Sequence, residues 1–246
     1  MMNILKSEFY KLKHTWVPWA HFILPVLYAL FFYSAATMTS LKNFSDMDII
    51  KNYFVLLGAV LPIICGVITS KVVDMEASAG RFQVILSTTK SRSKAYGGKL
   101  IMLLLSFLFS ISLAVFIFAM LFGNQGSMAW LIELLLVFIG CLSTYMIHLW
   151  VSIMLGGGAS IGLGFVETLL ALLSITNLGE NIWYFLPCTW ASRLSATYIV
   201  GSELADSSYL IKEFTMWGYV AIPITVVIFT GSLLWFNRWG GKSISE

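Results

Sequence analysis

The few charged residues of this chain are confined to short segments between long apolar stretches. Only 11% of the 246 residues are charged, and the mean hydropathy is +0.86. Six apolar stretches of about 18–27 residues could each cross a hydrocarbon core of about 30 Å as a helix. They occupy residues 17–38, 53–70, 100–122, 128–154, 159–176 and 214–236. The sequence therefore predicts an all-α polytopic membrane protein with a single transmembrane domain over residues 1–246.

The basic residues are shared unequally between the two sides that six spans create. With the N-terminus inside, the inner segments carry eleven Lys and Arg residues, six of them between residues 71 and 99, and the outer segments carry four. An excess of Lys and Arg is typical of cytoplasmic loops. We therefore expect both termini to be cytoplasmic. An alternative with five spans, in which residues 128–176 are divided differently, would place the C-terminus outside. The net charge of +3 fits this orientation better than binding of nucleic acid.

A basic amphipathic segment precedes the first span. Leu5, Phe9 and Leu12 recur at steps of four and three, so they share one face of a helix over residues 3–14. Such a helix is expected to lie in the cytoplasmic interface. This interfacial helix, within residues 1–16, is either a topological anchor or an elbow that positions a partner subunit.

A second amphipathic segment follows the second span, at residues 72–86. Its apolar residues recur at helical spacing, and we expect Glu76 on its exposed polar side. Gly80 has no side chain, so another surface can approach closely there. This segment is either a surface helix in a basic loop or a helix that docks into a groove of a cytoplasmic partner.

Two acidic residues lie within predicted spans. Glu133 is near the outer end of the fourth span, and Glu167 is near the middle of the fifth. A charge at that depth costs roughly 2.5–3.5 kcal/mol, so Glu167 should be protonated, paired, or facing a polar cavity or subunit interface. His148 is a conceivable partner. Glu167 then makes either an inter-helix hydrogen bond or a contact that serves substrate binding or gating.

The longest outer segment, residues 177–215, is rich in aromatic residues. Its rings could contact an amphipathic substrate, and the candidates are Trp183, Tyr184, Trp190 and Tyr198. An excess of acidic residues there could attract a cationic peptide. A short helix after Pro187 is expected on or in the outer leaflet. The alternative is a lid that only packs on its own spans.

Signatures of enzymes and metal sites are missing from the sequence. There is no HExxH, GxSxG or Walker motif, and the three His and three Cys residues are not spaced as ligands. We expect no catalytic residue, no metal and no cofactor in this chain. Energy for active transport would have to come from a partner chain.

The loop after the second span resembles the cytoplasmic loop of ABC-2-type permeases. The similarity rests on an acidic, glycine and basic pattern formed by Asp74, Glu76, Gly80, Arg81 and Phe82, with Arg92 and Lys99 farther along. The opening charged helix, the six spans and the outer aromatic segment are similar too. Residues 4–9 (ILKSEF) and 74–80 (DMEASAG) further resemble the lantibiotic-immunity permeases of that family.

The resemblance implies a permease subunit of an ATP-driven exporter that expels a lantibiotic or similar antimicrobial peptide from the membrane. It implies two copies of a cytoplasmic ATPase, which bind ATP and Mg²⁺, and a second, similar permease that is identical or different. The five residues from Asp74 to Phe82 named above would contact the ATPase. The implied location is the plasma membrane of a Gram-positive bacterium. Alternatives are an exporter of another amphiphile, drug or ion, and a scaffold or sensor that recruits cytoplasmic protein without transport.

Overall fold

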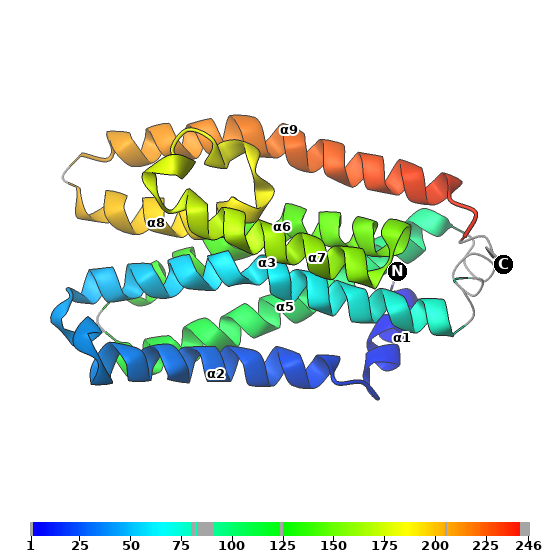
Figure 1. Cartoon of the computed structure of the whole chain (residues 1–246), viewed down its shortest axis with the longest axis horizontal. Helices are drawn as coiled ribbons and strands as arrows, with labels where there is room; N and C mark the ends of the chain where they lie inside the picture. The colour runs from blue at the N-terminus through cyan, green and yellow to red at the C-terminus, as the bar shows by residue number, and fades with distance from the viewer. Residues whose placement is uncertain (1, 80–81, 83–90, 124, 205, 242–246) are drawn as a thin grey trace.

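Long helices packed side by side along one axis make up the fold (Figure 1). The computed structural model describes residues 2–79, 82, 91–123, 125–204 and 206–241. Within these ranges there are helices and 3₁₀ turns but no strand. The long helices are α2 (Val17–Met38), α3 (Asp46–Ser78), α5 (Arg92–Phe122), α6 (Ser127–Leu155), α7 (Gly157–Ser174) and α9 (Ser208–Arg238). Shorter elements are α1 (Met2–Leu12), α8 (Trp190–Glu203) and the turns η1 (Ser40–Asn43), η2 (Asn177–Gly179), η3 (Trp183–Phe185) and η4 (Pro187–Thr189).

The predicted all-α fold with six spans is confirmed. In the described part of the chain, six helices are long and apolar enough to cross a membrane. The division of 128–176 into two spans occurs at Gly156, whose φ of 102° suits only glycine among the common residues. The fifth span ends at Ser174, two residues before the predicted end. Several helices extend well beyond the predicted spans, and α3 alone has 33 residues.

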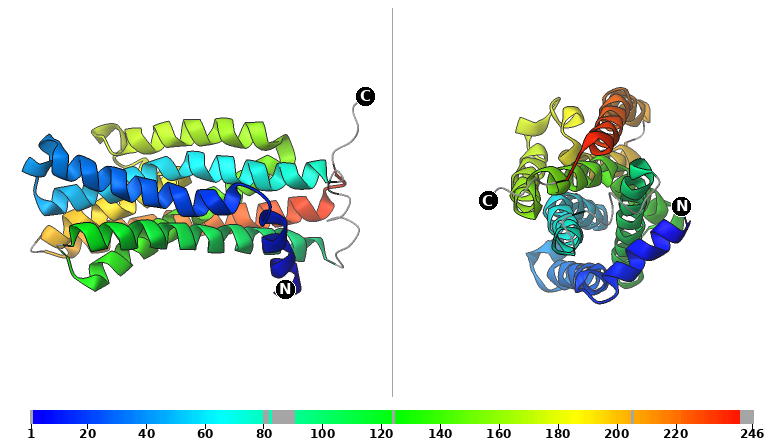
Figure 2. Two further views of the ribbon diagram at one scale, coloured as in Figure 1. Left: turned by 90° about the horizontal axis from the view of Figure 1, so that it is seen from below. Right: turned by 90° about the vertical axis from the view of Figure 1, so that its right-hand side faces the viewer.

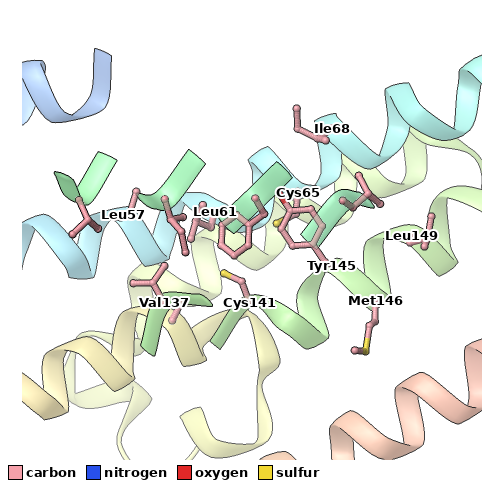
Figure 3. Packing of buried hydrophobic residues seen from close by; sticks show 14 of the residues in the cluster. Leu57, Leu61, Cys65, Ile68, Val137, Cys141, Tyr145, Met146 and Leu149 are labelled. Atoms are coloured by element: carbon pink, nitrogen blue, oxygen red, sulfur yellow. The ribbon is translucent and has the colours of Figure 1, made fainter. Parts of the chain in front are cut away.

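Helix α3 forms the centre of the bundle. In its most apolar 18-residue stretch 72% of the residues are buried, against 17% in α9. Leu57, Leu61 and Cys65 of α3 face Cys141 and Tyr145 of α6 across the core (Figure 3). Toward one end, the stacked rings of Tyr53 and Phe118, 3.9 Å apart, join α3 to α5. The outer faces of α2 and α9 remain available to lipid.

The segment after α7 folds back into the bundle. Its helix α8 is the predicted helix after Pro187, and it begins beside Gly58 and Gly140, near the middle of α3 and α6. Irregular backbone at membrane depth must find its hydrogen bonds inside the protein. The Thr189 hydroxyl donates to the Trp183 carbonyl at 2.9 Å, and the Trp190 indole donates to the Tyr184 carbonyl at 3.0 Å. Side chains of the segment thus donate hydrogen bonds to its own backbone carbonyl groups.

Gly140→Ala should destabilise the bundle because α8 lies directly on this glycine. An added Cβ would lie 2.6 Å from the backbone N and Cα of Ala191, so a backbone would have to move. Overpacking of this kind costs about 1–3 kcal/mol. Thermal unfolding of the purified protein in detergent measures the loss.

Gly162→Ala on α7 is the matched control, because a Cβ there meets open space. It should leave the unfolding temperature unchanged or raise it, since alanine favours helix over glycine by about 1 kcal/mol. Equal stability of the two variants would show that α8 does not lie against α6 as described.

Candidate functional site

One end of the bundle gathers the ends of four helices that are far apart in sequence. These are α1, the C-terminal end of α3, the N-terminal end of α5 and the C-terminal end of α9 (Figures 1 and 2). We call it the basic end, because the sequence places most Lys and Arg residues in these segments. Helix α1 lies across the bundle there, at a steep angle to α2 (Figure 2). The predicted helix before the first span is therefore present.

Four charged side chains form a closed ion cluster at the basic end. Lys99 of α5 lies with its Nζ 2.5 Å from Glu8 of α1 and 3.0 Å from Glu76 of α3. Lys11 of α1 contacts the same two carboxylates, each at 2.6 Å. Two positive and two negative charges thus balance one another. The ion cluster joins three helices, and the sequence alone did not reveal it.

The ion cluster is buried, which corrects the predicted position of Glu76. Glu76 is only 7% exposed, rather than on an exposed polar side, and Glu8 and Lys99 are similarly buried. The pattern along one helix could not show that α1 covers this face of α3. Burial lowers the pKa of Lys11, but the hydrogen bonds and charges of Glu76 and Glu8 outweigh that effect and raise its pKa above the usual value. Lys11 therefore keeps its charge at neutral pH.

The segment that follows Glu76 is not one continuous helix. Helix α3 ends at Ser78, and Phe82 has a φ of 67°, which non-glycine residues rarely adopt. The Phe82 ring is buried and packs edge-on against Trp239, with centroids 5.0 Å apart. The predicted helix over 72–86 is thus confined, where the structure describes it, to the last turns of α3. The candidates Gly80 and Arg81, and residues 83–86, lie outside the described residues.

Among the predicted coupling residues that the structure describes, Asp74 is the one that stays accessible. Its side chain is exposed and accepts a hydrogen bond from Ser70 at 3.2 Å. Nearby, the Arg92 guanidinium donates to the Trp239 carbonyl at 2.7 Å, and Ser93 donates to the side chain of Asn237. These bonds fasten the end of α9 to the start of α5. The basic end is therefore a junction that could pass a displacement from the loop after α3 into several spans.

The intramembrane acid Glu167 is paired with His148, the partner that the sequence suggested. His148 Nε2 lies 2.9 Å from Glu167 Oε2, and its Nδ1 lies 2.8 Å from the Ser160 hydroxyl. Thr69 of α3 and Ser152 of α6 extend the hydrogen bonds from Ser160. This polar network links α3, α6 and α7. Polar residues inside apolar spans were its only sequence signal.

Glu133 is fully buried in α6. Its two carboxyl oxygens make no hydrogen bond of normal geometry among the described residues, and the Ser195 hydroxyl of α8 lies beside it. No three His, Cys, Asp or Glu side chains in the described part of the chain gather closely enough to hold a metal ion.

Three of the four outer aromatic candidates lie inside the protein. Trp183 and Trp190 are each 1% exposed, and Tyr184 is 8% exposed. The Trp190 ring packs edge-on against Trp217 of α9, and the Tyr184 hydroxyl donates to Glu213 at 2.5 Å. Tyr198, the fourth candidate, is partly exposed. This burial favours the alternative of a lid that packs on its own spans, and contact with substrate stays a prediction.

Lys99→Met should destabilise the protein strongly, because it leaves two carboxylates buried with one cation. Breaking a buried charge cluster by removing one partner costs about 3–5 kcal/mol. The free energy of unfolding in detergent is the measurement.

Lys51→Met at the opposite end is the control for Lys99→Met. Lys51 pairs with Asp48 at 2.8 Å, but both side chains are about one-third exposed or more. Surface pairs contribute about 0–1 kcal/mol. A Lys99 variant that loses no more than the Lys51 variant would contradict a structural role for the ion cluster.

Glu167→Gln should be tolerated, whereas Glu167→Lys should not. Glutamine retains a hydrogen-bonding group of the same shape beside His148 Nε2, so the loss should stay within about 1 kcal/mol. Lysine carries an insertion cost of roughly 2.5–3.5 kcal/mol and removes the acceptor. Yield in the membrane fraction measures both, and normal accumulation of the lysine variant would mean that position 167 faces water.

A family model described as ABC-2 family transporter protein matches residues 4–170. This range is more than half of the chain, and it holds the whole ion cluster together with the His148–Glu167 pair. No curated protein and no solved structure matches the chain at a significant level. With its multi-pass helical bundle and this match, the chain belongs to the ABC-2 family of transporter permeases.

Proposed function

We propose that the chain is the permease subunit of an ATP-driven exporter and that its basic end lies in the cytoplasm. The observation that carries this proposal is the ion cluster, which ties α1, α3 and α5 together beside the loop after α3. A cytoplasmic ATPase that displaces this loop would move three helices as one unit. Two copies of the ATPase and a second, similar permease complete the proposed complex.

The proposed cargo is a lantibiotic or a similar antimicrobial peptide. Support comes from the two short sequence stretches at 4–9 and 74–80 and from the excess of acidic residues in the outer segment. One of these acids, Glu203, ends α8 and is exposed. An acidic outer surface attracts cationic peptides over roughly 8–10 Å at physiological salt. The buried rings of Trp183 and Trp190 would shape this surface from beneath.

Asp74 gives a cleaner test of coupling than Glu76. Because Glu76 lies in the buried ion cluster, its replacement would destabilise the fold. The Asp74 side chain, in contrast, is exposed and accepts a hydrogen bond from Ser70. If the ATPase docks here, Asp74→Ala should weaken its association about tenfold, which corresponds to about 1.4 kcal/mol. Resistance to the peptide should fall with it, while membrane yield stays normal.

The measurement is the amount of ATPase and the rate of ATP hydrolysis recovered with the tagged chain from native membranes. Asp48→Ala, at the opposite end, is the matched control and should change neither. Full resistance and normal ATPase recovery with Asp74→Ala would remove this surface from coupling. Hydrolysis by the chain alone, or no ATPase in the purified complex, would overturn the proposal itself.

A further inference from the structure

A narrow cavity lies between α2, α3, α5 and α6, away from the ion cluster and the polar network. The space inside it, together with the open region at its mouth, amounts to about 560 Å³. Its walls are apolar apart from a few groups, and none of the residues lining it is an Asp, Glu, Lys or Arg. We call it the lateral cavity. Leu57, Leu61, Ile68 and Tyr145, which line it, are labelled in Figure 3.

The mouth of the lateral cavity opens sideways between α2 and α3. Leu24 of α2 is 44% exposed, and Val60 and Ile64 of α3 are partly exposed. The residues from α5 and α6 at its base, such as Ile111 and Tyr145, are buried. In a membrane-spanning bundle this opening faces the lipid. A ligand would therefore enter from the bilayer.

Pro25 fixes the hydrogen bonding at the polar side of the lateral cavity. Proline has no N–H, so the carbonyl of His21, four residues earlier in α2, lacks its helical partner. The Ser110 hydroxyl of α5 lies 3.1 Å from this carbonyl and donates to it. Ser110 is also 3.1 Å from the Ser106 carbonyl, but that group already has its own partner within α5. The single hydroxyl hydrogen of Ser110 is therefore used in the bond to the His21 carbonyl.

This hydrogen bond determines the tautomer of His21. Its Nδ1 lies 2.6 Å from Ser110 Oγ, and since that oxygen gives its hydrogen to the carbonyl, Nδ1 carries the hydrogen and donates. In a neutral imidazole the other nitrogen is then an acceptor. His21 is one of the residues that line the lateral cavity, and its side chain is only 7% exposed. Its Nε2 is buried and has no partner among the described residues. A buried acceptor without a donor requires an explanation, and a donor group on a bound molecule would supply one.

We infer that the lateral cavity binds an uncharged, largely apolar molecule that donates one hydrogen bond, from a hydroxyl group, to His21 Nε2. The walls disfavour a charged head group because none of the lining side chains would neutralise it. The narrow, apolar space suits one alkyl chain and not a folded peptide. A neutral lipid of the bilayer and a free amphiphile share this chemistry. The inference does not depend on the proposed cargo or on an ATPase.

The probe for the test is a long-chain alcohol with a photoactivatable diazirine in its chain, and its methyl ether is the matched probe without a donor. Both are added to the purified full chain in lipid nanodiscs. The alcohol should label α2 within residues 17–28 and α3 within residues 57–68, about tenfold more strongly than the ether does. The ether cannot donate a hydrogen bond, so it would leave the buried Nε2 acceptor unpaired, which costs free energy. Mass spectrometry of the peptides locates the label.

His21→Phe should abolish the preference for the alcohol while retaining labelling by the ether. Its fold should persist because Ser110 bonds the backbone carbonyl, which the substitution keeps. His14→Phe, at an exposed position before α2, is the control and should keep the tenfold preference. Equal labelling by alcohol and ether in the unmodified chain, or a preference that survives His21→Phe, would overturn the assignment of the acceptor.

Ala114→Phe should reduce labelling by both probes at least tenfold, because Ala114 lines the lateral cavity. Ala159→Phe on the exposed face of α7 should not. Ala20→Phe, at the α2 wall, repeats the test if Ala114→Phe does not fold. Unchanged labelling in folded cavity variants would show that the probes bind elsewhere.

Extraction of the purified chain distinguishes the two sources. A hydroxylated lipid recovered from the unmodified chain but not from Ala114→Phe identifies a resident lipid. Binding of the added alcohol without such a lipid identifies a site for free amphiphiles. The absence of both a resident lipid and specific labelling would contradict the inference.

Discussion

The absence of water from the bilayer core governs how this chain folds. Each backbone N–H and C=O there needs a partner within the protein, and proline removes one. In α2, Pro25 frees the His21 carbonyl, which the Ser110 hydroxyl of α5 takes up. In α3, which contains Pro62, the N–H of Ile63 donates to the Thr168 hydroxyl of α7 at 3.2 Å. Single hydroxyl groups on neighbouring helices thus bond to the backbone beside both prolines and help to fix which helices are neighbours.

Helix α3 connects the polar features of the bundle along its length. It contributes Glu76 to the ion cluster and Thr69 to the network around His148. Farther along, Gly58 lets the backbone of α8 approach closely. A displacement of the α3 end that adjoins the loop would therefore reach both the intramembrane acid and the outer segment. This continuity gives a physical basis for the proposed coupling of a cytoplasmic ATPase to the opposite side of the membrane.

The sequence was sufficient to predict the class of fold, because hydropathy and charge respond directly to the bilayer. It also suggested the pairing of Glu167 with His148, since a lone acid in a span requires a partner. It failed at Glu76, whose burial depends on a helix distant in sequence, and it left open whether Trp183 contacts substrate or packs on the spans. Helix α1 covers Glu76, and the segment before α8 folds inward instead of lying on the surface. Periodicity along one segment carries no information about such contacts.

The central claim is that the ion cluster makes α1, α3 and α5 a single unit at the basic end. A double-mutant cycle between Glu8 and Lys99, with Glu8→Gln and Lys99→Met alone and combined, tests it most directly. The free energy of unfolding in detergent should give a coupling energy of about 1.5–3 kcal/mol, the upper range for residues in direct contact. A coupling energy below about 0.5 kcal/mol, the range found for independent sites, would contradict the claim.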